Sequence, residues 1–294
     1  MSPASPSPQV QPFHDPATGT LTYVVRDPHG PAAVVIDPLL DYDANAARTS
    51  TASADALLAW VREQGLDVLW ILETHAHADH LSAAGYLRDA LGAGIAIGRG
   101  IVGIQARFKA LFGLGDEFVA DGRQFDRLLD DGDALQVGAL TVRVLATPGH
   151  TEDGLSYVIG DAAFIGDTLF APASGTARTD FPGGDAAQLY ASIQRLLALP
   201  EDTRLFLCHD YPAQGAAPKI EVSVAEQRAH NLHVGQGASE ADFVARRRAR
   251  DAGLPVPRLL LPALQVNIRG GRLPPVEADG VAYLRLPLNR LGAQ

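Results

Sequence analysis

The chain has 294 residues, of which 47% are hydrophobic and 20% are charged, and its formal net charge at pH 7 is −10. This length and hydrophobic content are sufficient for one sizeable core, and a single α/β domain of this size is ordinary. The acidic balance argues against nucleic-acid and anionic-membrane partners, because both require clustered Lys and Arg.

The first residues are rich in Ser, Pro and Gln and show neither the basic start nor the apolar segment of a secretory signal. We therefore expect residues 1–12 to be a disordered lead-in and residues 13–294 to form one domain. No apolar run approaches the roughly 20 residues that span a bilayer. The single cysteine, Cys208, excludes an internal disulfide and favours a reducing cytoplasmic location.

The first part of the chain alternates strand-like and helix-like segments. Runs rich in β-branched residues predict strands over residues 21–26, 32–36 and 68–73. Apolar residues at helical spacing predict helices over residues 52–64 and 80–91, and a glycine follows each of them.

The middle of the chain is different, because residues 125–165 read as consecutive strands joined by Gly-containing turns. The clearest of these strands lie at residues 140–146 and 155–159. A helix over residues 185–199 and a strand over residues 204–207 follow. This order predicts an α/β fold of the αββα type, in which two packed sheets carry helices on their outer faces.

From about residue 222 the pattern changes again, so we expect a C-terminal helical extension over residues 222–294 on a core of residues 13–221. Helices are predicted over residues 222–232 and 240–252, and a hydrophobic stretch over residues 259–268 follows them. We interpret the arginines of the second helix as a solvated face or an oligomer contact. They are Arg246, Arg247, Arg248 and Arg250.

The strongest functional signal follows the predicted strand near residues 68–73, where the chain reads Thr-His-Ala-His-Ala-Asp-His over residues 74–80. In an extended segment residues i and i+2 point the same way, so His75 and His77 can converge on one ion. Asp79 and His80 fall where the chain turns and can face a second position. Three imidazoles and one carboxylate within six residues form a ligand set for Zn or Fe.

Three further metal-ligand residue types also follow predicted strands. His150 lies in Thr-Pro-Gly-His-Thr, Asp167 in Gly-Asp-Thr-Leu-Phe, and His209 in Cys-His-Asp-Tyr. The ordered set HxHxDH, TPGHT, GDTLF and a final His resembles the signature of the metallo-β-lactamase superfamily, over residues 75–209. The resemblance implies the αββα sandwich of that superfamily.

The resemblance also implies two metal positions. One would be served by His75, His77 and His150. The other would be served by Asp79, His80 and His209, with Asp167 bridging the two.

Two activities of that superfamily agree with this ligand set. Glyoxalase II, a binuclear thioester hydrolase, would use all seven ligands to activate a hydroxide against S-lactoylglutathione. Persulfide dioxygenases (sulfur dioxygenases) hold one Fe(II) with two His and one Asp, and they oxidise glutathione persulfide with O2 to sulfite and glutathione. All seven ligand types are present here, so the ligands leave both activities open.

Other segments favour the bacterial persulfide dioxygenase group. Residues 175–184 resemble its GRTDF segment, whereas glyoxalase II carries a GKFYEG-like stretch there. Asp210 after His209, and the tail segment over residues 261–267, are similar to that group as well. A scaffold that has lost its activity is disfavoured, because no ligand motif is broken.

Under the dioxygenase resemblance, His75, His150 and Asp167 are the expected catalytic ligands of one Fe(II) per chain. Two imidazoles and one carboxylate on one face leave three adjacent positions for substrate and O2. The remaining ligand-type residues would fix tautomers and guide protons behind that face, or hold a second metal such as Zn under the hydrolase reading. They are His77, Asp79, His80 and His209.

Glutathione is anionic at its carboxylate ends, so basic or phenolic side chains should bind it by charge-assisted hydrogen bonds. Arg178 and Tyr211, beside the metal motifs, are the first candidates, and Lys219 and Arg228 are further ones. Arg178 has an alternative role in pairing with Asp180 to brace its loop. The expected partners are the small-molecule persulfide and O2, and the resemblance implies a homodimer.

Overall fold

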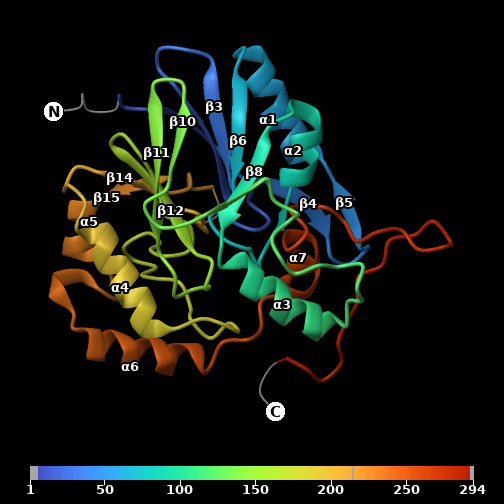
Figure 1. The fold of residues 1–294 in the computed structure, drawn as a ribbon. Helices are drawn as coiled ribbons and strands as arrows, with labels where there is room; N and C mark the ends of the chain where they lie inside the picture. The colour runs from blue at the N-terminus through green and yellow to red at the C-terminus, as the bar shows by residue number, and fades with distance from the viewer. Residues whose placement is uncertain (1–5, 214, 292–294) are drawn as a thin grey trace.

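The computed structural model describes residues 6–213 and 215–291, and over these it is an αββα sandwich. Two six-stranded sheets face each other, with α1, α2 and α3 outside the first and α4, α5 and α6 outside the second (Figure 1). The fold predicted from the strand and helix order is therefore confirmed. No helix of residues 6–213 and 215–291 has the length and apolarity to span a membrane.

The first sheet has the strand order β1-β2-β3-β6-β8-β9, and its last four strands are parallel. The helices α1, α2 and α3 make the crossovers that parallel pairing requires. The strands are β1 (Gln9–His14), β2 (Leu21–Arg26), β3 (Ala32–Ile36), β6 (Asp67–Leu72), β8 (Gly94–Gly98) and β9 (Arg127–Leu129). The crossover helices are α1 (Ala52–Glu63), α2 (Ala84–Leu91) and α3 (Ile101–Phe112).

The second sheet follows the chain in order from β10 to β15. Its strands are β10 (Ala134–Val137), β11 (Leu140–Ala146), β12 (Leu155–Ile159), β13 (Ala162–Phe164), β14 (Arg204–Phe206) and β15 (Glu221–Ser223). A small third sheet joins β5 (Arg48–Ser50), β4 (Leu39–Asp43) and β7 (Leu81–Ser82). The later helices are α4 (Ala186–Leu197), α5 (Val224–His230), α6 (Glu240–Asp251) and α7 (Leu260–Asn267), with a 3₁₀ turn at Gly235–Gly237.

The core has two layers, and alternation along single strands separates them. In β2, Tyr23 and Val25 are buried between the two sheets, whereas Val24 is buried on the side of α1–α3. In β3, Val34 and Val35 divide in the same way. Apolar residues on both faces of these strands are expected, because the first sheet is covered by the second sheet on one side and by α1–α3 on the other.

The chain becomes ordered earlier than the sequence predicts. Gln9–His14 form β1, an edge strand paired antiparallel with β2, so residues 9–12 are not part of a disordered lead-in. Pro12 is compatible with this strand, because an edge strand has one row of backbone groups without a sheet partner. Residues 1–5 of the predicted lead-in lie outside the described residues.

One predicted helix begins later than expected, and one helix was not predicted. The helix predicted over residues 80–91 begins at Ala84, because Leu81–Ser82 are extended and pair with β4. The prediction missed α3, although its buried residues follow helical spacing. These residues are Ile101, Ile104, Gln105, Phe108 and Phe112.

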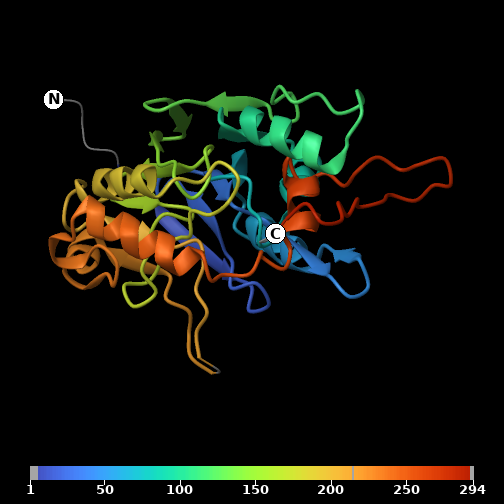
Figure 2. The same cartoon turned by 90° about the horizontal axis from the view of Figure 1, so that it is seen from below.

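The helices of the C-terminal extension pack into the core, whereas residues 273–288 carry several exposed apolar side chains. Leu260, Leu264 and Val266 of α7 are buried in the same cluster as α1–α3, and α7 packs against β7. In Figure 2, α6 lies along the side of α4, and α7 lies beside the blue and cyan elements.

Arg247 is buried, which corrects the interpretation of the α6 arginines as one solvated face. Its side chain is 3% exposed and forms an ion pair with Asp251, at 2.6 Å from Nη2 to Oδ1. The same Asp251 accepts hydrogen bonds from the backbone N and the hydroxyl of Thr179. Phe243, Arg247 and Asp251 lie four residues apart, so α6 turns one stripe inward.

We expect Asp251→Ala to lower the free energy of unfolding by about 3 kcal/mol, because it leaves a buried guanidinium and a buried amide without their acceptor. Chemical denaturation would measure this change. Arg248→Ala, on the exposed side of α6, is the matched control and should change stability by less than about 0.5 kcal/mol. A loss below about 1 kcal/mol for Asp251→Ala would contradict the assigned role of this ion pair.

Candidate metal centre

The predicted metal ligands converge because the strands that precede them end at one edge of the sandwich. His150, Asp167 and His209 follow β11, β13 and β14, which run in the same direction within the second sheet. The loop over residues 74–80 follows β6 of the first sheet. The fold therefore brings together residues that are up to 134 positions apart, from 75 to 209.

The ligand atoms form two groups that meet at Asp167. The ligand atoms of His75, His150 and Asp167 all lie within 4.8 Å of one another. His150 Nε2 is 3.6 Å from Asp167 Oδ2, and His209 Nε2 is 3.4 Å from Asp167 Oδ1. Asp167 therefore lies between the two groups, as a bridging residue must.

The second group consists of His77, Asp79, His80 and His209, whose ligand atoms also lie within 4.8 Å of one another. Its shortest contact between unlike groups is 3.2 Å, from His209 Nε2 to Asp79 Oδ2. The resemblance implied that His77 shares an ion with His75 and His150. In the structure the ring centroids of His75 and His77 are 4.0 Å apart, and His77 groups with the second set.

Unpartnered polar atoms show that this cluster fits a metal ion. Within the described residues, His75 Nε2, His80 Nε2 and Asp167 Oδ1 are buried and accept or donate no hydrogen bond. Both ring nitrogens of His77 and of His209 are in the same condition. Buried polar atoms without partners are rare because each costs free energy, and a bound cation would supply the missing partner.

The imidazole tautomers present their Nε2 atoms to this centre. His150 Nδ1 is 2.7 Å from the carbonyl oxygen of Arg178, which can only accept, so Nδ1 carries the proton. His80 Nδ1 faces the carbonyl of Leu81 at 3.3 Å in the same way. In both rings Nε2 keeps its lone pair for a metal.

The tautomer of His75 is fixed through a relay that begins at Asp37. The Thr74 hydroxyl donates to Asp37 Oδ2 at 2.8 Å, so its oxygen accepts from His75 Nδ1 at 3.0 Å. The backbone N of Thr74 donates to the other oxygen of Asp37. Nε2 of His75 is again the free ligand atom.

Asp37 and Asp153, which the sequence motifs did not indicate, hold the backbone of the metal loop. Asp37 follows β3 and has a positive φ of 49°, a conformation that aspartate adopts more readily than most residues other than glycine. Its Oδ1 lies 3.1 Å from His77 Nε2, although not with the geometry of a hydrogen bond. Asp153 accepts from the backbone N of Ala76 at 2.8 Å. The sequence signals that could have indicated them are the position of Asp37 directly after a strand and that of Asp153 two residues after the TPGHT motif.

Burial dominates the electrostatics of the cluster. It raises the pKa of Asp167 to about 7 and that of Asp37 to about 6, and it lowers the pKa of His75 and His77 well below the usual range. Burial also acts to raise the pKa of Asp79, but the charges of His209 and His80 outweigh it and lower that pKa to about 2. The low pKa values of His75 and His77 favour their neutral form, which is the form in which an imidazole binds a metal.

A pocket opens over the centre. Phe170, Phe181 and Leu254 form its apolar wall, and Arg178, Tyr211 and Arg250 supply polar groups. Tyr211 is 70% exposed, and its ring lies parallel to that of His209. Gly19 packs against this ring so closely that a Cβ there would lie 2.5 Å from Tyr211 Cε1.

The predicted substrate-binding residues divide between pocket and surface. Arg178 lines the pocket, but its guanidinium is held by both oxygens of Asp180 and by the carbonyl of Pro255. Lys219 and Arg228 do not line this pocket, and they pair with Glu226 and Glu201. Arg250, for which a solvated face or an oligomer contact was predicted, lines the pocket and makes no ion pair or hydrogen bond within the described residues.

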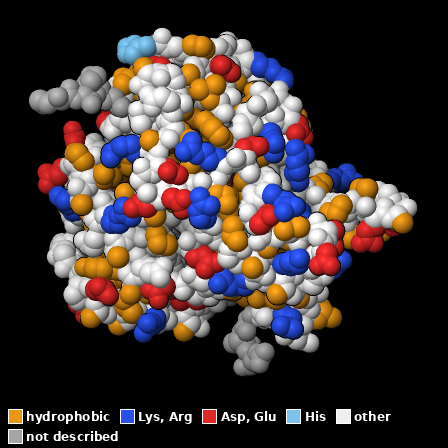
Figure 3. All heavy atoms as spheres, in the orientation of Figure 1, with side chains coloured by type: hydrophobic (Ala, Val, Ile, Leu, Met, Phe, Trp, Pro, Cys, Tyr) orange, Lys and Arg blue, Asp and Glu red, His pale blue; other side chains and the backbone are white. Residues whose placement is uncertain are grey.

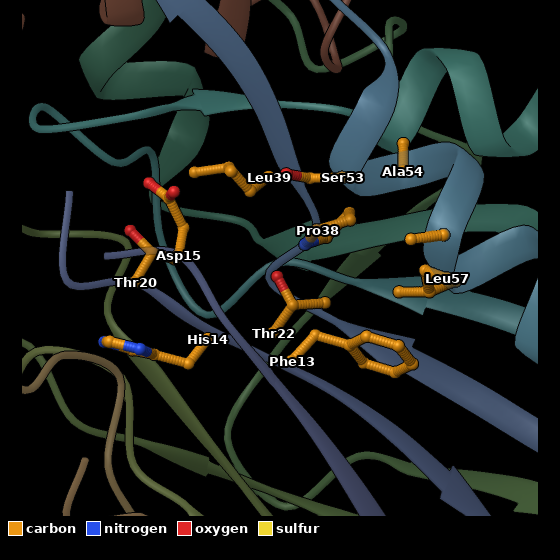
Figure 4. A pocket seen from close by; sticks show the side chains of 11 residues that line it. Phe13, His14, Asp15, Thr20, Thr22, Pro38, Leu39, Ser53, Ala54 and Leu57 are labelled. Carbon is orange, nitrogen blue, oxygen red and sulfur yellow. The ribbon is translucent and has the colours of Figure 1, made fainter. Parts of the chain in front are cut away.

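A second hollow lies beside β1 and α1, with His14, Asp15 and Thr22 among its lining residues (Figure 4). Its polar groups already have partners: Thr22 donates to the carbonyl of Asp37, and Asp15 accepts from Thr18. On the face seen in Figure 3, basic and acidic side chains are interspersed. The pocket over the metal centre is therefore the better candidate for chemistry.

Comparison with known proteins gives the family and its near members. The family model of the metallo-beta-lactamase superfamily matches residues 15–209. A protein of Burkholderia pseudomallei named as a probable metallo-hydrolase is 51% identical over 292 residues, covering 96% of this chain and 99% of that protein. A beta-lactamase hydrolase-like protein of Agrobacterium fabrum is 52% identical over 284 residues, which are 97% of this chain but 65% of the relative.

Two groups of less similar proteins bear on the activity. Glyoxylase B2 of Dictyostelium discoideum is 44% identical over 96% of this chain and 97% of that protein. The human mitochondrial persulfide dioxygenase ETHE1 is 32% identical over 87% of this chain and 86% of that protein. The crystal structure of ETHE1 from Myxococcus xanthus matches with a TM-score of 0.71 and 32% identity, over 90% of this chain and 100% of that one.

We expect Asp167→Ala to reduce the metal content of the purified protein to less than about a tenth, because Asp167 contacts both ligand groups. Elemental analysis per chain would measure it. Asp210→Ala is the control, since Asp210 is a pocket carboxylate outside both groups and should leave metal content unchanged. Retention of the wild-type metal content by Asp167→Ala would contradict its place in the centre.

Proposed function

The chain belongs to the metallo-beta-lactamase superfamily, and on that premise we propose that it is a persulfide dioxygenase. It would oxidise glutathione persulfide with O2 to sulfite and glutathione at a mononuclear Fe(II) held by His75, His150 and Asp167. The 32% identity to human persulfide dioxygenase over 87% of the chain supports the proposal.

The contact between residues 178–181 and His150 is the main support for the dioxygenase over the hydrolase. The segment over residues 178–181, which resembles the dioxygenase motif, directly contacts a ligand of the three-residue group. The Arg178 carbonyl accepts from His150 Nδ1, and the Phe181 ring lies edge-on to the His150 ring at 4.9 Å between centroids. The segment thereby fixes both the tautomer and the orientation of this ligand.

The reaction balances without any further oxidant. One persulfide, one O2 and one water give the thiol, sulfite and two protons, and four electrons pass from the terminal sulfur to O2. When bound, Fe(II) would supply adjacent open positions at which the sulfur and O2 meet. The chain's own residues orient the persulfide and exclude bulk water, since Phe170 and Phe181 wall the pocket.

The protons that the reaction releases need acceptors near the centre. His209 Nε2 lies 3.2 Å from Asp79 Oδ2 and 3.4 Å from Asp167 Oδ1, which places an imidazole between two carboxyl groups. Asp79 is the most exposed member of this set, at 31% of its side chain, and lines the pocket. This arrangement supports a path from the centre toward solvent.

The pocket residues support an anionic substrate. Arg178 is neutralised by Asp180, so its charge braces the loop. Arg250 and the exposed residue Tyr211 are then the groups available for a carboxylate of glutathione.

A binuclear hydrolase acting on S-lactoylglutathione is the alternative, and two observations favour it. The second group of four ligand-type residues is compact enough for another ion. The relatives named as hydrolase-like proteins, and glyoxylase B2, are more similar to this chain than the persulfide dioxygenases are.

Metal counting combined with oxygen uptake separates the two activities. We expect anaerobically purified protein to hold about one Fe per chain, and to consume O2 and form sulfite when glutathione persulfide is added. In His80→Ala the iron should remain, because His80 belongs to the second group only. Two metals per chain, no O2 uptake and cleavage of S-lactoylglutathione would replace the proposal with the hydrolase.

For substrate binding, we expect Arg250→Ala to raise KM for glutathione persulfide about tenfold while kcat changes little, because one charge-assisted hydrogen bond is lost. Steady-state O2 uptake would measure both constants. Arg248→Ala, two residues away on the exposed side of α6, should leave KM unchanged. Equal KM values for Arg250→Ala and the wild type would remove Arg250 from the binding site.

A further inference from the structure

A single amide on the C-terminal helix holds the loop that carries four of the ligand-type residues. Asn267 Nδ2 donates to the carbonyl oxygens of His77 at 2.8 Å and His80 at 2.9 Å. Its Oδ1 accepts from the backbone N of Ser82 at 2.8 Å. Both amide protons and one acceptor site are thus used on residues 77–82, and Asn267 is 5% exposed.

The two carbonyls that Asn267 binds, those of His77 and His80, lie at the two ends of the second half of the metal motif. The loop over residues 74–80 belongs to no helix or strand, so its shape depends on tertiary contacts. Its first half is held by Asp37 and Asp153, through the backbone N of Thr74 and of Ala76. Asn267 makes the corresponding contacts around Asp79, the most exposed of the ligand-type residues.

The helix that presents Asn267 is itself firmly placed. Leu260, Leu264 and Val266 are buried in the core, and Asn267 is the last residue of α7. Beyond it, Gly271 has a φ of 75° and approaches the start of α2 so closely that a Cβ would lie 2.9 Å from the carbonyl oxygen of Ser82. A clamp on a rigid element positions a ligand loop more accurately than a clamp on a mobile segment.

We propose that Asn267 is a positioning residue of the metal centre, which holds residues 77–82 in the metal-binding conformation before an ion arrives. The C-terminal helix α7 then contributes to the centre by positioning its loop, although no residue of α7 is a candidate ligand. Asn267 has this role at the metal centre whether the reaction there is oxidation or hydrolysis.

Gln265 offers a matched control on the same helix. It is 1% exposed, and its side chain also makes three hydrogen bonds, to the carbonyls of Leu261 and Arg285 and from the backbone N of Arg285. None of these reaches the metal loop. Gln265→Ala therefore removes a buried amide of similar size and bonding without touching residues 77–82.

The test is metal binding by the full chain, with Zn2+ and Co2+ as probes. We expect Asn267→Ala to bind Zn2+ between about 10-fold and 100-fold more weakly than the wild type, and to change the visible spectrum of bound Co2+. Gln265→Ala should lose stability but keep the wild-type Zn2+ affinity and Co2+ spectrum. Circular dichroism of each metal-free variant would establish that it is folded.

Asn267→Ser keeps the proposal testable if Asn267→Ala does not fold, because a serine hydroxyl can replace at most one of the three bonds. It too should bind Zn2+ more weakly than Gln265→Ala. Wild-type Zn2+ affinity in a folded Asn267 variant would overturn the proposal, and so would an equal loss in the Asn267 and Gln265 variants. Neither result depends on which substrate the enzyme turns over.

Discussion

Several of the metal-ligand atoms at one edge of the two sheets are buried without hydrogen-bond partners among the residues that the structure describes. Their burial lowers the stability of the fold, and the arrangement of the rest of the structure depends on this constraint. Nε2 of His75 and of His80, and Oδ1 of Asp167, are desolvated without a hydrogen bond within the described residues. An unpartnered buried polar group costs about 1–3 kcal/mol, and a domain has only about 5–15 kcal/mol of stability in total. A bound cation would offset this cost, and metal binding would then be coupled to folding.

The sandwich holds these unpartnered ligands in place because each of them follows the end of a well-paired strand. β6 lies within the first sheet, and β11, β13 and β14 lie within the second, so the strands before the ligands are fixed on both sides. The connecting backbone is then held by side chains from elsewhere, namely Asp37, Asp153 and Asn267. Each of these three satisfies a backbone group of residues 74–82 that has no helix or sheet to complete it.

The sequence was informative where a signal is local and uninformative where a contact is distant. Strands over residues 21–26 and 155–159 were predicted with the observed ends, because short apolar runs between turn residues are local patterns. Asn267 bonds to a carbonyl 190 positions away, and the segment over residues 261–267 that ends with it contains no local pattern that predicts this contact. Arg247 was misread for the same reason, since its burial follows from the packing of α6 on α4 and from Asp251.

The contacts of the imidazoles within each metal group bear on the choice between one metal and two. In the second group, His77 lies 3.1 Å from Asp37, and His209 lies 3.2 Å from Asp79, so these imidazoles keep carboxylate neighbours of their own. In the first group, His150 Nε2 lies 3.6 Å from Asp167 and Nδ1 donates to the Arg178 carbonyl, whereas His75 Nε2 has no partner within the described residues. Both ring nitrogens of His77 and of His209 also make no hydrogen bond there, so the second group too contains buried atoms that a cation would stabilise. Binding of a cation would therefore stabilise either group, and the metal content per chain distinguishes one metal from two.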